Sequence, residues 1–308
     1  MQDTRLAFAT PINAPQWQRW LVLSPVARII FFAAMFLLLG YSLAALLPDT
    51  RSNAVAIGSL THIRRYLITF TLPAVLAYVL LVRLLERRPV TELALRRVLP
   101  DSLLGTAAGL LLFSAVVGVL YLSGSYHIIG TDPDAPWLPA LLVVGLGAGI
   151  GEEVICRGVL FRIIEEGLGT WAALMVSALL FGAAHITNPG ATLWSSAAIA
   201  IEAGLLFGLV YHVTRSLPVC MGLHAAWNFA QDTIYGIPVS GFKADGWLVS
   251  TRSGPDWLSG GAFGAEASVV ALSLCSVCTL GLVIVAVRRG SIVPCVPWQR
   301  FLQWLSRR

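Results

Sequence analysis

Residues 103–122 read LLGTAAGLLLFSAVVGVLYL, an uninterrupted run without a charged side chain. A helix of about 20 mostly apolar residues is long enough to cross the hydrocarbon core of a bilayer. Comparable runs recur along the chain, which predicts an all-α, polytopic transmembrane helix bundle of about eight spans. The predicted spans are residues 28–47, 66–85, 102–124, 137–160, 170–187, 193–213, 217–235 and 267–287.

The composition of the whole chain agrees with this prediction. Of its 308 residues, 57% are hydrophobic and 12% are charged, whereas about 25% of the residues of a soluble domain are charged. The mean hydropathy is +0.77. The net charge of +5 does not indicate nucleic acid as a partner, because the basic residues lie at the ends of apolar runs, where they set membrane orientation. The predicted partner is the lipid bilayer.

The distribution of Lys and Arg predicts the orientation. With eight spans, 16 of the 21 basic residues would lie on the side of the N-terminus. Cytoplasmic loops are enriched in Lys and Arg, so both termini are expected in the cytoplasm of a multi-pass protein of the cell (plasma) membrane. Three regions are expected: residues 1–136 with three spans, residues 137–235 with four core spans, and residues 236–308 with an interfacial loop, the last span and a cytoplasmic tail.

Ionisable side chains inside the apolar runs are costly, so each is a candidate for function. Glu153 and Arg157 are four residues apart on one predicted helix, so they can neutralise each other and are assigned a supporting role. Glu202 is also buried by pattern, but it has no evident partner. The candidates for chemistry are Glu152, His185, His224 and Asn228.

The spacing of these candidates predicts that they meet. The fourth and fifth spans form a hairpin that turns near residues 166–170, with Glu152 14 residues before the turn and His185 15 residues after it. At 1.5 Å per residue, both lie about 21–22 Å from the turn, at one level of two antiparallel helices. His224 and Asn228 are i and i+4, so they share one face of a later helix.

Three motifs occur in order along residues 137–235: Glu152-Glu153…Arg157, Phe181…His185 and His224…Asn228. This order resembles the CAAX-protease and bacteriocin-processing family of intramembrane endopeptidases, which includes the type II CAAX prenyl endopeptidases. The chain contains no HExxH, no GxSxG and no rhomboid- or presenilin-type motif. A weaker similarity extends to residues 260–266.

The resemblance implies a catalytic core and a role for each candidate. Glu152 would be the general base that activates water, with His185 helping to hold the water. A carboxylate shielded from bulk water is a better base near neutrality. His224 and Asn228 would stabilise the oxyanion, since fixed donors act strongly where the dielectric constant is low. The substrate would be a protein or peptide. A C-terminal or lipid-modified segment is one form that this substrate could take.

Other interpretations remain open from the sequence. Glu152, His185 and His224 together with a water would also make a catalytic zinc site, so the cofactor prediction is none, with zinc as the second choice. A transporter could relay protons through the buried Glu and His residues, but the internal repeat or matching broken helices of a transporter are not found in this sequence. A catalytically silent scaffold of the same fold is the third interpretation.

Overall fold

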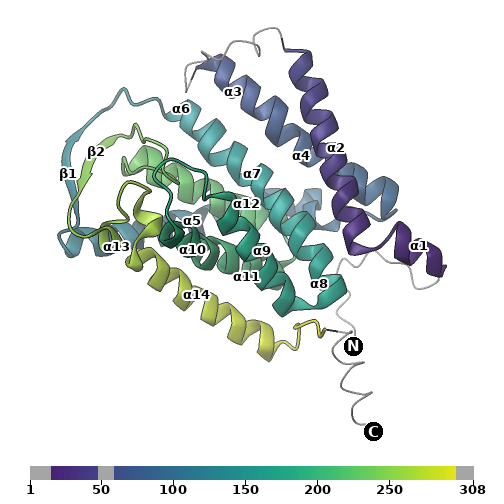
Figure 1. Cartoon of the computed structure of the whole chain (residues 1–308). Coiled ribbons are helices and arrows are strands. Elements are labelled where there is room, and N and C mark those ends of the chain that lie inside the picture. The colour runs from purple at the N-terminus through teal and green to yellow at the C-terminus, as the bar shows by residue number, and fades with distance from the viewer. Residues whose placement is uncertain (1–14, 48–58, 296–308) are drawn as a thin grey trace.

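The computed structural model describes residues 15–47 and 59–295, and these form an almost entirely helical bundle (Figure 1). Within them, six helices are long and apolar enough to cross a membrane. This confirms the predicted all-α polytopic bundle and indicates a multi-pass membrane protein. The six helices are α2 (Pro25–Ala45), α3–α4 (Leu60–Leu85), α5 (Leu95–Leu122), α6–α8 (Trp137–Leu168), α10–α11 (Leu193–Thr214) and α14 (Val269–Arg288).

The predicted number of eight spans was wrong, although all eight predicted segments are largely helical. Helix α9 (Thr170–Ala184) has 15 residues and is therefore about 22 Å long, shorter than the hydrocarbon core of about 30 Å. Helix α12 (Leu217–Phe229) carries His224 and Asn228, and these side chains are buried within the protein. Helix α9 is thus too short to span the core, and α12 is enclosed by the bundle and need not satisfy the hydropathy of a lipid-facing span.

Four of the helical stretches contain π-helical turns, which are frequent at functional sites. The α3–α4 helix consists of α3 (Leu60–Tyr66), η1 (Leu67–Thr71), α4 (Leu72–Leu80) and η2 (Leu81–Leu85). The α6–α8 helix consists of α6 (Trp137–Pro139), η4 (Ala140–Gly147), α7 (Ala148–Glu153), η5 (Val154–Phe161) and α8 (Arg162–Leu168). The α10–α11 helix consists of α10 (Leu193–Ile199), η6 (Ala200–Leu205) and α11 (Leu206–Thr214), and η7 (Ala230–Ile234) continues α12.

A small antiparallel sheet lies at one end of the bundle, beside α13 (Figure 1). Its two strands pair with a register irregularity between Ile128 and Gly130. The second strand and α13 fall in the predicted interfacial loop, which therefore contains ordered secondary structure. The remaining elements are α1 (Gln16–Leu21), η3 (Thr91–Leu93), β1 (Tyr126–Thr131), β2 (Leu248–Arg252), α13 (Asp256–Ser259) and η8 (Ala265–Ala267).

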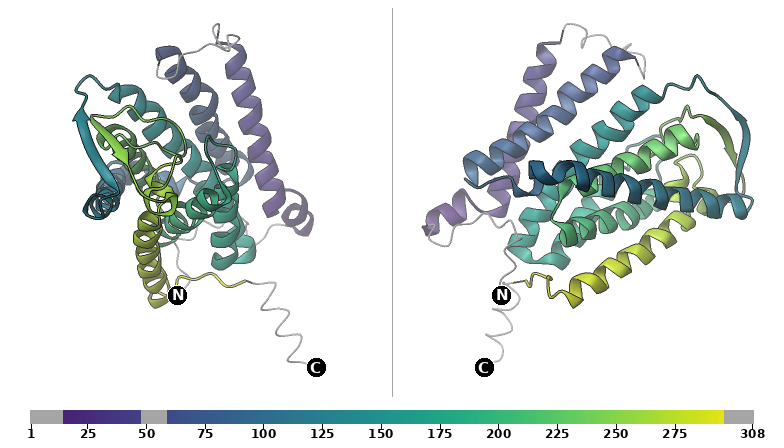
Figure 2. Two further views of the ribbon diagram at one scale, coloured as in Figure 1. Left: turned by 60° about the vertical axis from the view of Figure 1, so that its left-hand side comes forward. Right: turned by 180° about the vertical axis from the view of Figure 1, so that it is seen from behind.

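Helix α12 is the centre of the bundle because glycines let α5 approach it closely. A Cβ at Gly105 would lie 2.0 Å from the carbonyl oxygen of Val219, and one at Gly109 would lie 2.4 Å from that of Leu223. Figure 2 (right) shows α5 running along α12. This is the packing that GxxxG spacing permits, and it fixes the helix that carries His224.

The predicted hairpin between the fourth and fifth segments is present. Helix α8 ends at Leu168, Gly169 adopts a positive φ of 86°, and α9 begins at Thr170. A glycine is favoured here because a side chain would strain this backbone conformation. The turn sets α9 beside η5 and α8, which brings the second motif next to the first.

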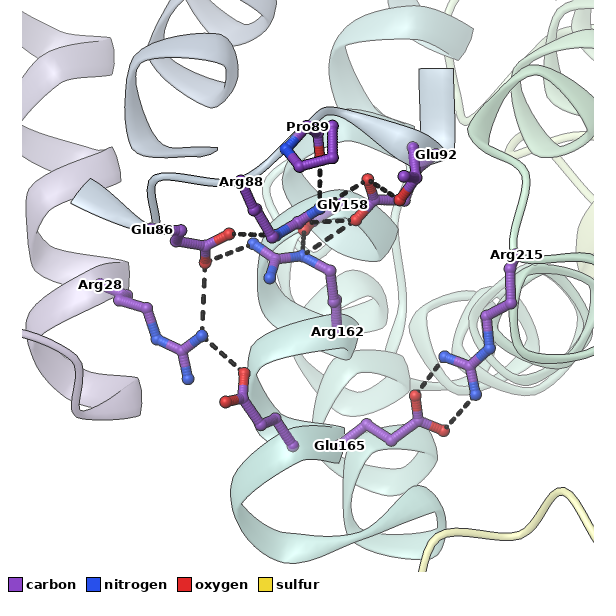
Figure 3. Close-up of polar contacts among 11 residues, drawn as sticks. Arg28, Glu86, Arg88, Pro89, Glu92, Gly158, Arg162, Glu165 and Arg215 are labelled. Carbon is purple, nitrogen blue, oxygen red and sulfur yellow. Dashed lines mark hydrogen bonds and ion pairs between the residues drawn. The ribbon is translucent and has the colours of Figure 1, made fainter. Parts of the chain in front are cut away.

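An ion cluster of three arginines and three glutamates joins α2, η2, η3 and α8 at one end of the bundle (Figure 3). Arg162 and Arg28 both donate to Oε1 of Glu86, at 2.8 and 3.3 Å. The members of the ion cluster are Arg28, Glu86, Arg88, Glu92, Arg162 and Glu166. The three arginines of the ion cluster thus lie at one end of the bundle. The predicted orientation also places these three arginines on one side of the membrane. The two chain termini and Arg51, which that prediction also uses, lie outside the described residues.

Candidate active site

The first motif forms a buried ion pair that ties three helices together. Nη1 of Arg157 donates to Oε1 of Glu153 at 2.8 Å, and Nη2 donates to the carbonyl oxygen of Ala203 at 2.8 Å. Its guanidinium group lies 5.0 Å from the ring centroid of Phe181 and 5.3 Å from that of Phe207. Cation–π contacts of this kind are stronger when they are desolvated. The i, i+4 pair predicted from the sequence therefore exists and also positions α9 and η6.

The same carboxylate holds His224, a contact that was not predicted. Nδ1 of His224 lies 2.8 Å from Oε1 of Glu153, which is fully buried. A carboxylate oxygen accepts, so Nδ1 carries the hydrogen and the ring is fixed with Nε2 on its other side. Nε2 lies 4.0 Å from Oε2 of Glu152. Glu153 therefore orients the histidine toward Glu152, as partner carboxylates orient imidazoles in other sites.

Glu152 lies at the edge of the site. Its side chain is 26% exposed, so the protein encloses this carboxylate less completely than the sequence led us to expect. Close packing brings α3 and η1 against this part of the chain, because Gly147 faces Tyr66 and Gly151 faces Phe70. The neighbouring Glu153 points inward and Glu152 does not, so the two adjacent glutamates have different surroundings.

His185, His224 and Asn228 line one cavity. His185 follows the last residue of α9, and its Nδ1 lies 2.8 Å from the carbonyl oxygen of Phe181. A carbonyl can only accept, so Nδ1 is the donor and Nε2 is left as an acceptor. Nδ2 of Asn228 donates to the carbonyl oxygen of Val144 at 2.9 Å, which leaves its second N–H available. The structure thus brings three of the four candidates into one cavity and places Glu152 beside the third motif.

The loop after α12 covers this cavity. Nδ2 of Asn188 donates to the carbonyl oxygen of Ser240 at 3.1 Å, and the backbone N–H of Gly241 donates to that of Phe263 at 2.7 Å. Phe263 is buried. These contacts hold the loop of residues 238–266 together and tie it to the turn that follows α9, so an ordered segment lies over one side of the cavity.

Two further acidic residues line the cavity, Glu202 and Glu266. The sequence marked Glu202 as buried but gave it no partner, and Glu266 belonged only to the weaker similarity at residues 260–266. The two residues are 64 positions apart, and only the packing of η6 and η8 around one cavity brings them together.

The donor set for zinc is not assembled. Among the side chains of residues 15–47 and 59–295, no three His, Cys, Asp or Glu groups are arranged to hold a metal ion. Glu153 holds Nδ1 of His224, and the carbonyl oxygen of Phe181 holds Nδ1 of His185, so Nε2 of each ring is the atom left for a metal ion. The three side chains of Glu152, His185 and His224 are therefore not gathered into a metal site in this structure, although each of them carries a free donor atom.

Comparison with known proteins agrees with the position of the site. Residues 134–230 match the family model described as type II CAAX prenyl endopeptidase Rce1-like. This range contains Glu152, Arg157, His185, His224 and Asn228. No curated protein sequence matches the chain. Over its central third the chain is thus similar to the Rce1-like type II CAAX prenyl endopeptidases, which confirms the predicted resemblance.

Proposed function

We propose that this chain is a membrane-embedded endopeptidase that hydrolyses a peptide bond with a glutamate-activated water. The family match supports a protease. One structural observation carries the catalytic type: the buried Glu153 fixes His224 so that Nε2 lies 4.0 Å from Glu152, next to the cavity lined by His185 and Asn228. A base, a nitrogen atom that accepts a hydrogen bond from water, and two donors for the oxyanion therefore lie close together.

In this proposal Glu152 acts as the base. Its carboxylate takes a proton from water as the water oxygen forms a bond to the carbonyl carbon of the substrate. The resulting carboxylic acid then gives the proton to the amine nitrogen as the C–N bond breaks, which restores the carboxylate. His185 helps to hold the water through Nε2, the acceptor that its bond to Phe181 leaves unused.

His224 and Asn228 would stabilise the tetrahedral oxyanion. Because Glu153 already takes the Nδ1 hydrogen, a neutral His224 would have no hydrogen on Nε2. The donor role therefore belongs to the imidazolium, ion-paired with Glu153. Asn228 donates through the N–H that Val144 does not use. Preorganised donors of this kind lower the barrier where the negative charge develops.

The substrate class follows from the proposed reaction and surroundings. A peptide or protein segment would enter from the bilayer or from its interface. A C-terminal or lipid-modified segment is one such substrate. We place the enzyme in the cell membrane with both termini in the cytoplasm, on the charge bias of the sequence.

Glu152→Gln tests the proposal, because glutamine keeps the shape of the side chain and removes the basic oxygen. We expect purified Glu152→Gln to lose cleavage of a peptide library while its thermal melt in detergent stays like that of the parent. Asp134→Asn is the matched control, since it removes one carboxylate from an exposed loop position. Full cleavage by Glu152→Gln would rule out Glu152 as the base.

Chelation tests the catalytic type separately. The geometry leads us to expect an unchanged cleavage rate after treatment with a chelator. Loss of activity with chelator, restored by added zinc, would contradict the glutamate mechanism and support the zinc alternative.

A further inference from the structure

The cavity contains two carboxylates that the proposed hydrolysis does not use. Glu202 comes from η6, within the α10–α11 helix, and Glu266 from η8, just before α14. Both residues are 2% exposed and both line the cavity with His185, His224 and Asn228. They therefore lie where the residues next to a scissile bond would be bound.

Glu202 has an unsatisfied atom. Its Oε2 is buried and has no hydrogen-bond partner in the described part of the chain. A buried carboxylate without a partner is strongly unfavourable, and buried polar atoms in native proteins usually have one. An unpaired atom of this kind beside a cavity indicates that a ligand group supplies the partner.

Glu266 is only partly satisfied. The backbone N–H of Ser240 donates to its Oε1 at 2.5 Å. Burial raises the pKa of Glu266 above its ordinary value, against the lowering effect of that hydrogen bond and of His185. The cavity thus disfavours the negative charge as long as no cation lies close to it.

The two arginines near the cavity are engaged elsewhere. Arg157 binds Glu153 and the carbonyl oxygen of Ala203. Arg252 influences Glu266 electrostatically but donates to the carbonyl oxygen of Ser259. No Lys or Arg among the described residues forms an ion pair with Glu202 or Glu266. The basic groups in the cavity are thus the histidines His185 and His224, and neither carboxylate has a Lys or Arg as a direct counterion among the described residues.

We propose, resting on the endopeptidase function above, that Glu202 and Glu266 form a subsite for the ammonium or guanidinium group of a substrate Lys or Arg side chain. Such a group brings several N–H donors and a positive charge to the two carboxylates. Phe181, Phe207 and Trp227 also line the cavity and would pack against the methylene part of the side chain. The enzyme would then select peptides with a basic residue near the cleaved bond.

Binding to the uncleaving Glu152→Gln variant tests the subsite independently of catalysis. The probes are fluorescent peptide libraries that carry Lys or norleucine at one position; norleucine has a similar alkyl chain and no charge. We expect the Lys library to bind at least about tenfold more tightly at one position, since hydrogen bonds to charged groups support a difference of this size. Adding Glu202→Gln should reduce the ratio to about one, whereas adding Asp134→Asn should leave it unchanged.

The outcomes separate the two proposals. Equal binding of the Lys and norleucine libraries at every position would overturn the subsite, as would a Lys preference that survives both Glu202→Gln and Glu266→Gln. If Glu202→Gln does not fold in a detergent melt, Glu266→Gln decides the question alone. A parent protein that prefers Lys but cleaves no peptide would contradict the endopeptidase function and leave the subsite standing.

Discussion

At the scale of single residues, Arg157 carries more of the structure than its place in a motif indicates. It pairs with Glu153, binds backbone carbonyls of η6 and lies between the rings of Phe181 and Phe207. We expect Arg157→Ala to lower the free energy of unfolding by about 3–5 kcal/mol, because it leaves a buried carboxylate with one partner fewer. Detergent melts measure this loss. A parent-like melt with only turnover reduced would show that Arg157 is not structural.

Asn228 should affect the rate more than the fold. Removal of one oxyanion donor typically lowers kcat by about 10²–10³-fold, so Asn228→Ala should keep measurable activity and an almost unchanged KM. Kinetics on one cleaved peptide separate the two constants. A change confined to KM would assign Asn228 to substrate binding and contradict its donor role.

The residue contacts also show which parts of the site can be predicted from sequence. Glu153 and Arg157 are four residues apart, so their pairing follows from helix geometry alone. The bond from Glu153 to His224 spans 71 residues, and no local rule predicts which helix meets which. A similar limit applies to Glu202 and Glu266, because their common cavity exists only after the helices have packed.

At the scale of helices, the contact between α5 and α12 positions His224 and Asn228. We expect Gly105→Ala to lower the melting temperature and the activity together, because its methyl group would meet the carbonyl oxygen of Val219 at 2.0 Å and overpacking typically costs about 1–3 kcal/mol. Gly118→Ala is the matched control on the same helix, since a Cβ there has nothing within 4 Å. Equal melts for the two variants would contradict this account.

Helix positions were predicted well because apolar runs and their breaks are local features. The turn at Gly169 lies inside the predicted range of 166–170. Whether a helix crosses the bilayer was predicted less well, since that depends on its neighbours. Helix α9 is short, and α12 carries polar groups that other helices cover. An apolar run therefore predicts a helix more reliably than it predicts a span.

At the scale of the whole molecule, α5 separates two ends of different character. The ion cluster lies beside its first residues, and the β1–β2 sheet follows its last ones (Figures 1 and 3). Its 28 residues span about 42 Å, enough to connect the two faces of a membrane. Basic residues gather at the first end. The positive-inside rule then predicts the ion cluster on the cytoplasmic side and the sheet on the other.

Cysteine labelling of intact cells measures this orientation. Arg96 and Lys243 are exposed; Arg96 lies at the start of α5, and Lys243 lies in the loop between α12 and β2. We expect a membrane-impermeant maleimide to label Lys243→Cys in intact cells and Arg96→Cys only after permeabilisation, with the signal of the parent, which has five cysteines, subtracted. The reverse pattern would invert the orientation and place the ion cluster outside. Labelling of both positions from one face would contradict a path of α5 across the membrane, and with it the assignment of the two ends to opposite sides.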